Sequence, residues 1–326
     1  MLLTTALLFG LALAATGQTA PAQPAPAIPA IPVPLWPDLP ATTSDTAPAD
    51  SSVQPLLAFR TSDVKFHLAD LMEVLRDRRH EGWVLAAYPD PKTGRPLIGA
   101  GFSLDLPERE HPQTDPLNPH PFVEPSSAQL WAAAGLDPAR LQQILTDYDA
   151  RLADWKMKRF RRRIDDLEPQ ITDRDATALL RIAAIQAIVN AQAYCRNFDG
   201  LTASQQMAMS QLVYQMGVNL GEFTNFLALV NQSGVSATDS DWRAVQQSLE
   251  QSQWARLYRV RAVSVIAMLD PQYDDSPAVA ERQVAAVLRP AHHRRRRAAA
   301  LETASYHRHA RHSARHRAGT RSRRKV

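Results

Sequence analysis

The sequence predicts an α+β fold that is mostly α-helical, with a small β-hairpin lobe and a larger helical C-terminal lobe. Three observations lead to this prediction. Apolar residues recur at helical spacing along most of the chain, helix-capping residues precede several of these stretches, and one Pro- and Gly-rich stretch over residues 88–102 ends in apolar residues typical of a short strand. The 326 residues are 45% hydrophobic and 21% charged, which is enough apolar material for a sizeable core.

The beginning of the chain has the composition of export and tethering segments. Residues 2–15 form a short apolar run ending in small residues, so we expect a signal peptide over residues 1–19. No Lys or Arg precedes the run, which leaves an uncleaved anchor as an alternative. Residues 20–57 repeat Pro and Ala, as in an extended linker. The expected location is therefore the periplasm or the extracellular side of the cell envelope.

A folded domain is predicted over residues 58–290. Its first helix is expected to start near Ser62 and to end at Glu81, because apolar residues follow helical spacing between them. The stretch over residues 88–102 then forms a small β-hairpin. The single Cys195 excludes an intrachain disulfide, and we interpret it as a buried thiol.

An insertion over residues 105–169 follows the hairpin. Its first part is rich in proline and is expected to be a loop, and a helix is predicted from Pro138 to Trp155. The apolar stripe of this helix must bury against another surface, as a lid, a dimer contact or an enlargement of the small lobe. Six bases crowd into residues 156–163, and we interpret them as a solvated helix face because acidic residues follow at once.

Several helices are predicted after residue 170. Thr172 with Asp175, and Thr202 with Gln205, each fit a capping box, in which the two side chains cap each other's backbone N–H. The first box begins a long helix expected to join the two lobes. Further helical stripes are predicted over residues 242–249, 254–269 and 278–288.

Charge is unevenly distributed along the chain. The formal net charge is +4, but residues 289–326 carry 13 of the 37 Lys and Arg and the single acid Glu302, so this tail is +12 and the remainder is −8. We expect a disordered basic tail over residues 291–326 that binds an anionic envelope polymer or a lipid surface. Nucleic acid is not the expected partner of an exported protein.

Two carboxylates are candidates for acid–base chemistry. Hydrolysis of a glycosidic bond uses a protonated carboxylic acid and a second carboxylate. Glu81 is the candidate acid because a helix C-terminus disfavours negative charge, although Arg78 and Arg79 act in the opposite direction. Asp90, flanked by prolines, is the candidate second carboxylate. On spacing alone, a solvated Glu and a turn-forming Asp are the simpler interpretation.

Two separate stretches carry a family resemblance. Glu81-Gly82 with Tyr88, Asp90, Gly94 and Ile98-Gly99-Ala100-Gly101 resembles the active-site hairpin of the phage-type lysozymes, the endolysin-like muramidases of glycoside hydrolase family twenty-four. The second stretch runs from Leu212 to Arg261 and is similar to the C-terminal helical lobe of that family in order and spacing. The similarity covers about residues 66–104 and 170–269.

The resemblance implies a lysozyme-like fold and a muramidase that cleaves the β-1,4 bond between N-acetylmuramic acid and N-acetylglucosamine of peptidoglycan, without a cofactor or a metal ion. By position, Glu81 would protonate the leaving oxygen, and Asp90 would support the attacking water or the developing positive charge. Arg261 matches an Arg that approaches the catalytic Glu. The positions at which family members contact sugar are Ser103, Tyr214, Phe226 and Ser248.

Two departures from the family pattern keep other hypotheses open. Leu97 stands where the family has a Thr that holds the catalytic water, and Phe102 stands where the family has a His. Leu makes no hydrogen bond, and Thr93 would replace the missing hydroxyl only if the turn folds inward. The alternatives are a lysozyme-like protein that binds glycan without turnover, a lytic transglycosylase that needs only Glu81, and a basic nucleic-acid-binding protein.

Overall fold

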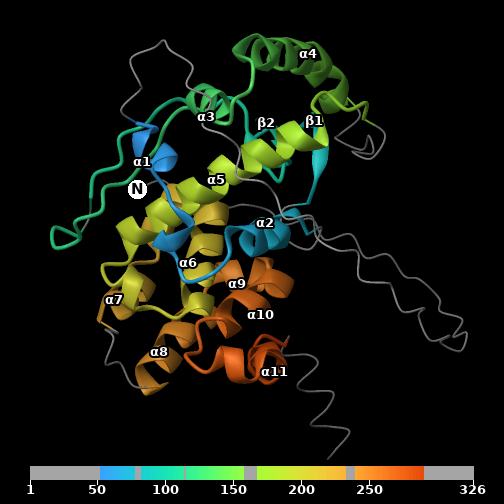
Figure 1. The fold of residues 1–326 in the computed structure, drawn as a ribbon. Helices are drawn as coiled ribbons and strands as arrows, with labels where there is room; N and C mark the ends of the chain where they lie inside the picture. Colours follow the sequence, from blue (N-terminus) through green and yellow to red (C-terminus); the bar gives the residue numbers. More distant parts are fainter. Residues whose placement is uncertain (1–51, 78–81, 114, 158–166, 233–238, 290–326) are drawn as a thin grey trace, which may run out of the picture. The chain divides into compact units, whose positions relative to one another are not determined.

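Helices account for most of the described chain, and a small antiparallel sheet lies near its start (Figure 1). The computed structural model describes residues 52–77, 82–113, 115–157, 167–232 and 239–289, which belong to one compact unit. The helices are α1 (Gln54–Leu57), α2 (Leu68–Arg76), α3 (Ser127–Ala133), α4 (Pro138–Met157), α5 (Asp173–Tyr194), α6 (Ala203–Met216), α7 (Thr224–Gln232), α8 (Asp239–Glu250), α9 (Gln253–Leu257), α10 (Arg259–Ala267) and α11 (Pro277–Val287). The predicted class, α+β and mostly α, is confirmed. The predicted signal peptide and basic tail lie outside the described residues.

The sheet contains the predicted hairpin and one further strand. Its strands are β1 (Val84–Pro89), β2 (Pro96–Gly99) and β3 (Phe102–Ser103), in the order β1-β2-β3 and antiparallel throughout. Tyr88 pairs with Leu97, and Leu97 pairs in turn with Ser103. Pro96, Ile98 and Gly99 of β2 are buried, and Ile98 is 0% exposed. The sheet therefore presents one side to the hydrophobic core.

The first helix is shorter than the sequence predicted. Ser62 and Asp63 form a 3-10 turn, because the Asp63 carboxylate accepts the backbone N–H of Arg60 at 2.8 Å. A bent segment over residues 64–67 follows, and α2 begins only at Leu68. The helix ends at Arg76, so the predicted end at Glu81 is wrong, and Glu81 itself lies outside the described residues.

The packed part of the chain begins earlier than residue 58. Gln54–Leu57, inside the predicted linker, form α1, and its Leu56 is 1% exposed. This helix packs on α5. The predicted linker therefore ends before α1.

Helix α5 is the centre of the fold. Its predicted capping box is present: Thr172 Oγ1 accepts the N–H of Asp175 at 3.1 Å, and the Asp175 carboxylate accepts the N–H of Thr172 at 3.1 Å. The helix packs against α1, α2, α3, α6, β2 and β3. In the part of the chain that the structure describes, α5 is the one helix that is long and apolar enough to cross a membrane. However, 61% of its apolar 18-residue stretch is buried inside the protein, as in a core helix.

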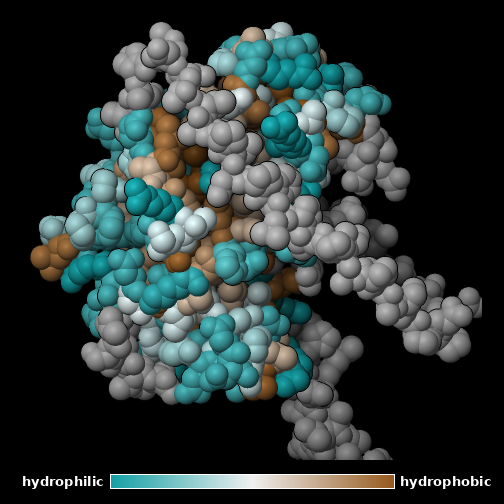
Figure 2. All heavy atoms as spheres, in the orientation of Figure 1, coloured by the Kyte–Doolittle hydropathy of each residue, from teal (hydrophilic) through white to brown (hydrophobic). Residues whose placement is uncertain are grey.

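The C-terminal helices α6–α11 pack on one another and include one unexpected break. The capping box of α6 is present, with Thr202 Oγ1 accepting the N–H of Gln205 at 3.2 Å, and α8 and α11 match predicted stripes. The single stripe predicted over residues 254–269 is instead two helices, α9 and α10, because Tyr258 leaves the helical conformation at φ −112° and ψ 43°. On the face seen in Figure 2 the surface over these helices is mostly hydrophilic, and α9–α11 also carry exposed apolar side chains, such as Leu257 and Val260.

The insertion forms α3 and α4, of which only α4 was predicted. Ser126 and Gln129 make a capping box that begins α3. Leu141, Ile144 and Tyr148 of α4 are buried, and the helix packs on β1. Of the three roles considered for this helix, the enlarged small lobe is the one that the contacts support.

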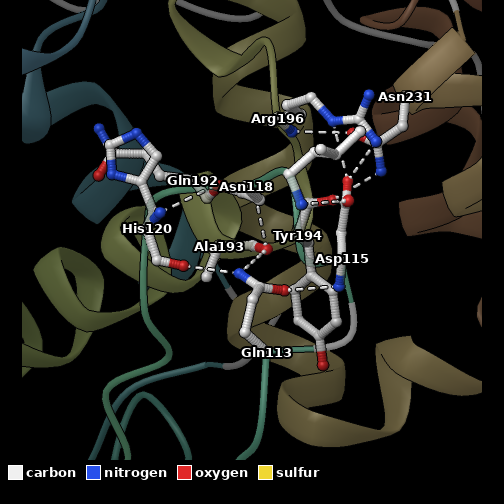
Figure 3. A network of polar contacts seen from close by, with 10 residues as sticks. Gln113, Asp115, Asn118, His120, Gln192, Ala193, Tyr194, Arg196 and Asn231 are labelled. Carbon is white, nitrogen blue, oxygen red and sulfur yellow. Dashed lines mark hydrogen bonds and ion pairs between the residues drawn. The ribbon is translucent and has the colours of Figure 1, made fainter.

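The loop before α3 is bonded to the C-terminal end of α5 (Figure 3). Asn118 donates to the carbonyls of Gln192 and Ala193 at 2.8 and 2.9 Å, and Gln113 donates to Ala193 at 3.1 Å. These amides pair carbonyl groups that a helix end leaves without intrahelical partners. Arg196, just after α5, contacts Asp115 at 2.7 Å. The proline-rich loop is thus a fixed part of the fold.

Candidate functional site

Asp90 builds the turn that joins β1 to β2. Its N–H donates to the carbonyl of Arg95, and its carbonyl accepts the N–H of Gly94, both at 2.8 Å. Its side-chain Oδ1 accepts the N–H groups of Lys92 at 2.6 Å and of Thr93 at 2.9 Å. Gly94 has φ +72°, a conformation that favours glycine. The carboxylate is half-buried, and its Oδ2 has no hydrogen-bond partner among the described residues.

Helix α4 of the insertion contacts this turn through Tyr148. Tyr148 of α4 is 3% exposed and donates its phenol O–H to the carbonyl of Gly94 at 2.6 Å. Burial, and then the charges of Asp105, Asp149 and Asp90, raise the pKa of Tyr148 to about 12. The phenol therefore keeps its proton, and the donor, at any physiological pH.

The hairpin also contacts the C-terminal helices at two points. Tyr214 of α6 donates its O–H to the carbonyl of Ala100 at 2.9 Å. Lys92, in the Asp90 turn, donates to the Tyr258 hydroxyl at 3.2 Å and lies 5.7 Å from the centre of that ring. Tyr258 precedes α10, which carries the buried Arg261, 7% exposed. The turn of Asp90 thus lies beside the start of the helix that carries Arg261.

Glu81 lies outside the described residues, and the structure describes the chain up to Asp77 and again from Gly82. Gly82 donates its N–H to the carbonyl of Asp77 at 3.2 Å. Because α2 ends at Arg76, the effect of its dipole is strongest at Asp77 and not at Glu81. The Trp83 ring donates its N–H to Asp173 at 2.8 Å, and its centroid lies 4.0 Å from the Arg76 guanidinium.

Three predicted sugar-contacting residues have other partners. Ser103 donates its hydroxyl to the Asp105 carboxylate at 3.1 Å, and Ser248 donates to the carbonyl of Val245 within α8 at 2.7 Å. Both serines are half-buried. Phe226 of α7 is 2% exposed and belongs to the hydrophobic core, so its ring presents no surface to a ligand. The structure therefore gives Phe226 a packing role.

The position of the family Thr has no hydroxyl in this fold. Leu97 is half-buried on β2. Thr93 is exposed, and its hydroxyl accepts the N–H of Arg95 at 3.3 Å within the turn. The hydroxyl of Thr93 is therefore engaged in the turn that Asp90 builds.

Sequence analysis missed the residues that hold the hairpin in place. Tyr148 and Tyr258 contact it from chain positions 54 and 166 residues away, and no local pattern signals such contacts. Among the described residues, no group of three or more His, Cys, Asp and Glu side chains could hold a metal ion.

Comparisons with protein-family models, with curated proteins and with solved structures found no match to this chain.

Proposed function

We propose that this protein is an exported peptidoglycan hydrolase that cleaves the β-1,4 bond between N-acetylmuramic acid and N-acetylglucosamine. One observation carries the proposal. The two stretches that separately resemble phage-type lysozymes meet in space, through the bonds from Tyr214 to Ala100 at 2.9 Å and from Lys92 to Tyr258 at 3.2 Å. Such contacts are expected if the two stretches share the lysozyme-like fold, and a chance resemblance would not explain them.

In this proposal the residues take the roles that the resemblance implies. Glu81 protonates the leaving glycosidic oxygen, and Asp90 uses Oδ2 to orient water or to stabilise positive charge on the sugar. Arg261 acts beside the acid, and Tyr214 and the rim of the hairpin contact the glycan. Export follows from the apolar leader over residues 2–15. The basic tail binds an anionic polymer or lipid of the envelope.

A second candidate function is a lysozyme-like protein that binds glycan strands without cleaving them. Leu97 and Thr93 favour this function, because Leu97 has no hydroxyl and the Thr93 hydroxyl oxygen already accepts the N–H of Arg95 within the turn. A mispositioned catalytic water can lower a rate by about two orders of magnitude.

The test is solubilisation of purified peptidoglycan by the full chain, with mass spectrometry of the products. We expect muropeptides with reducing ends, and we expect Glu81→Gln to abolish them. Anhydro ends would point to transglycosylation. No release, with retention of the protein on the wall, would refute hydrolysis and support glycan binding alone.

A matched variant separates catalysis from structure. Asp90→Asn keeps an Oδ1 acceptor for the turn but removes the carboxylate charge. The proposal expects this variant to fold normally, to bind the wall and to lose most of the activity. Full activity in Asp90→Asn would exclude the role given to its carboxylate.

A further inference from the structure

A groove lies between α2, α10 and α11, on residues that the proposed function does not use. Its volume is about 810 Å³. Asp70, Glu73 and Asp77 line it from the side of α2. Their spacing of three and four residues places them on one face, along about 10 Å of helix axis. Asp70 and Glu73 are exposed, and neither has an ion-pair partner among the described residues.

A buried amide of α6 also lines the groove. Gln211 is 3% exposed, and its Nε2 donates to the sulfur of Met268 at 3.5 Å. Its Oε1 has no hydrogen-bond partner in the described part of the chain. A buried acceptor without a donor is unfavourable, so a ligand that supplies an N–H group gains binding energy here.

These features together select an arginine side chain as ligand. Its guanidinium group carries a charge opposite to that of the α2 carboxylates and presents several N–H donors in one plane. Carboxylate and amide oxygens are both acceptors for such donors. The two arginines that line the groove, Arg259 and Arg289, lie on the side of α10 and α11 and are exposed.

The chain itself supplies arginines at the edge of the groove. Arg289, which lines the groove, is the last described residue, and residues 290–326 follow it with 12 Lys and Arg and the single acid Glu302. Arg294–Arg297 come five to eight positions after Arg289. An extended chain of that length reaches about 16–29 Å, and Arg289 itself lines the same groove as α2.

We propose that the groove between α2, α10 and α11 is a binding site for arginine side chains, and that its occupant is this protein's own segment 290–326. The segment then has two alternative partners, the carboxylates of α2 and an external polyanion. Occupation of the groove lowers the number of tail charges available to an external polyanion.

The experiment follows trypsin cleavage after Arg294–Arg297 in the full chain, by mass spectrometry. The groove variant combines Asp70→Asn with Glu73→Gln. The control variant combines Glu110→Gln with Asp149→Asn, which removes the same charge from exposed residues of the insertion outside the groove. We expect the groove variant to be cut about three- to ten-fold faster than the wild type at low salt, since each exposed pair contributes modestly. The control variant should match the wild type.

Three further results decide the proposal. Salt of about 0.5 M should raise the wild-type rate to that of the groove variant. Equal rates for the wild type and the groove variant at low salt would overturn the site. Protection that grows with protein concentration would show that a second copy supplies the segment and would overturn the intramolecular occupant.

Discussion

Asp90 is a carboxylate whose two oxygens have different surroundings. Oδ1 accepts two backbone N–H groups of its own turn, while Oδ2 has no partner among the described residues. Hydrogen bonds to one oxygen fix the plane of the carboxylate and leave the other available for a water or a sugar. The turn-forming and the catalytic interpretations of this residue are therefore compatible.

The packing role of Phe226, in place of the predicted sugar contact, can be tested directly. The ring is 2% exposed in the core, so Phe226→Ala should lower the free energy of unfolding by about 3–5 kcal/mol, the usual cost for a buried phenylalanine. Urea denaturation measures this loss. A loss below about 1 kcal/mol, together with weaker glycan binding, would restore the sugar-contacting role.

His111 predicts a pH effect on stability. Its ring stacks on Phe122 at 3.9 Å, and burial, followed by the nearby Arg109, lowers its pKa. A histidine whose pKa is lower in the folded than in the unfolded state binds its proton more weakly when the protein is folded, so protonation favours unfolding. The free energy of unfolding should therefore decrease as the pH falls below about 6.5.

The variant His111→Phe isolates this contribution, because it keeps an aromatic ring against Phe122. Melting temperatures between pH 7.5 and 5 should fall less in the variant than in the wild type. Parallel pH profiles for the two proteins would show that His111 has no such role.

At the scale of elements, the two helix starts marked by a capping box were predictable. The boxes at Thr172 and Thr202 are local, because each side chain bonds a backbone group three positions away. The same signal occurs at Ser126 and Gln129, where the surrounding prolines favour the prediction of a loop. The break at Tyr258 carries no Gly or Pro, so the apolar stripe continues across it in the sequence.

The candidate site was less predictable, because its contacts join distant elements. Tyr214 meets Ala100 across 114 positions, and no spacing rule relates such residues. The family resemblance placed both stretches in one fold, but it did not cover α4, whose Tyr148 holds the Asp90 turn. Long-range packing, which local propensity does not encode, decided these contacts.

Besides packing on β1, helix α4 bonds the Asp90 turn through the Tyr148 hydroxyl, and a substitution can remove this hydrogen bond. Tyr148→Phe keeps the buried ring but removes the donor to Gly94, and we expect a loss of about 0.5–1.5 kcal/mol in the free energy of unfolding. If the protein cleaves peptidoglycan as proposed and α4 positions the Asp90 turn, the cleavage rate should fall by a larger factor than the loss of stability alone explains. A normal catalytic rate in the folded variant would restrict α4 to a packing role.

At the scale of the whole molecule, charge is divided between the tail and the rest of the chain. The tail is +12 and the remainder is −8, so association with an anionic surface should weaken as salt is raised. Sedimentation of the full chain with anionic vesicles at several salt concentrations measures this effect, and neutral vesicles are the control. Salt-independent binding would contradict an electrostatic role for the tail.

The same division predicts a stronger association at lower pH. Six histidines lie in the tail, and they gain charge as the pH falls below about 6.5. Lower pH therefore has two separate consequences. It lowers the free energy of unfolding through His111, and it strengthens the binding of the tail to an anionic surface.

The position of α1 has a mechanical consequence. Leu56 is buried, and its short helix packs directly on α5, the central helix of the fold. Tension applied through the residues that precede α1 therefore enters the protein at its middle and not at a peripheral strand. If the leader anchors the protein, the pull acts first on α1 and passes through it to α5, and stretching experiments should detach α1 before the sheet yields.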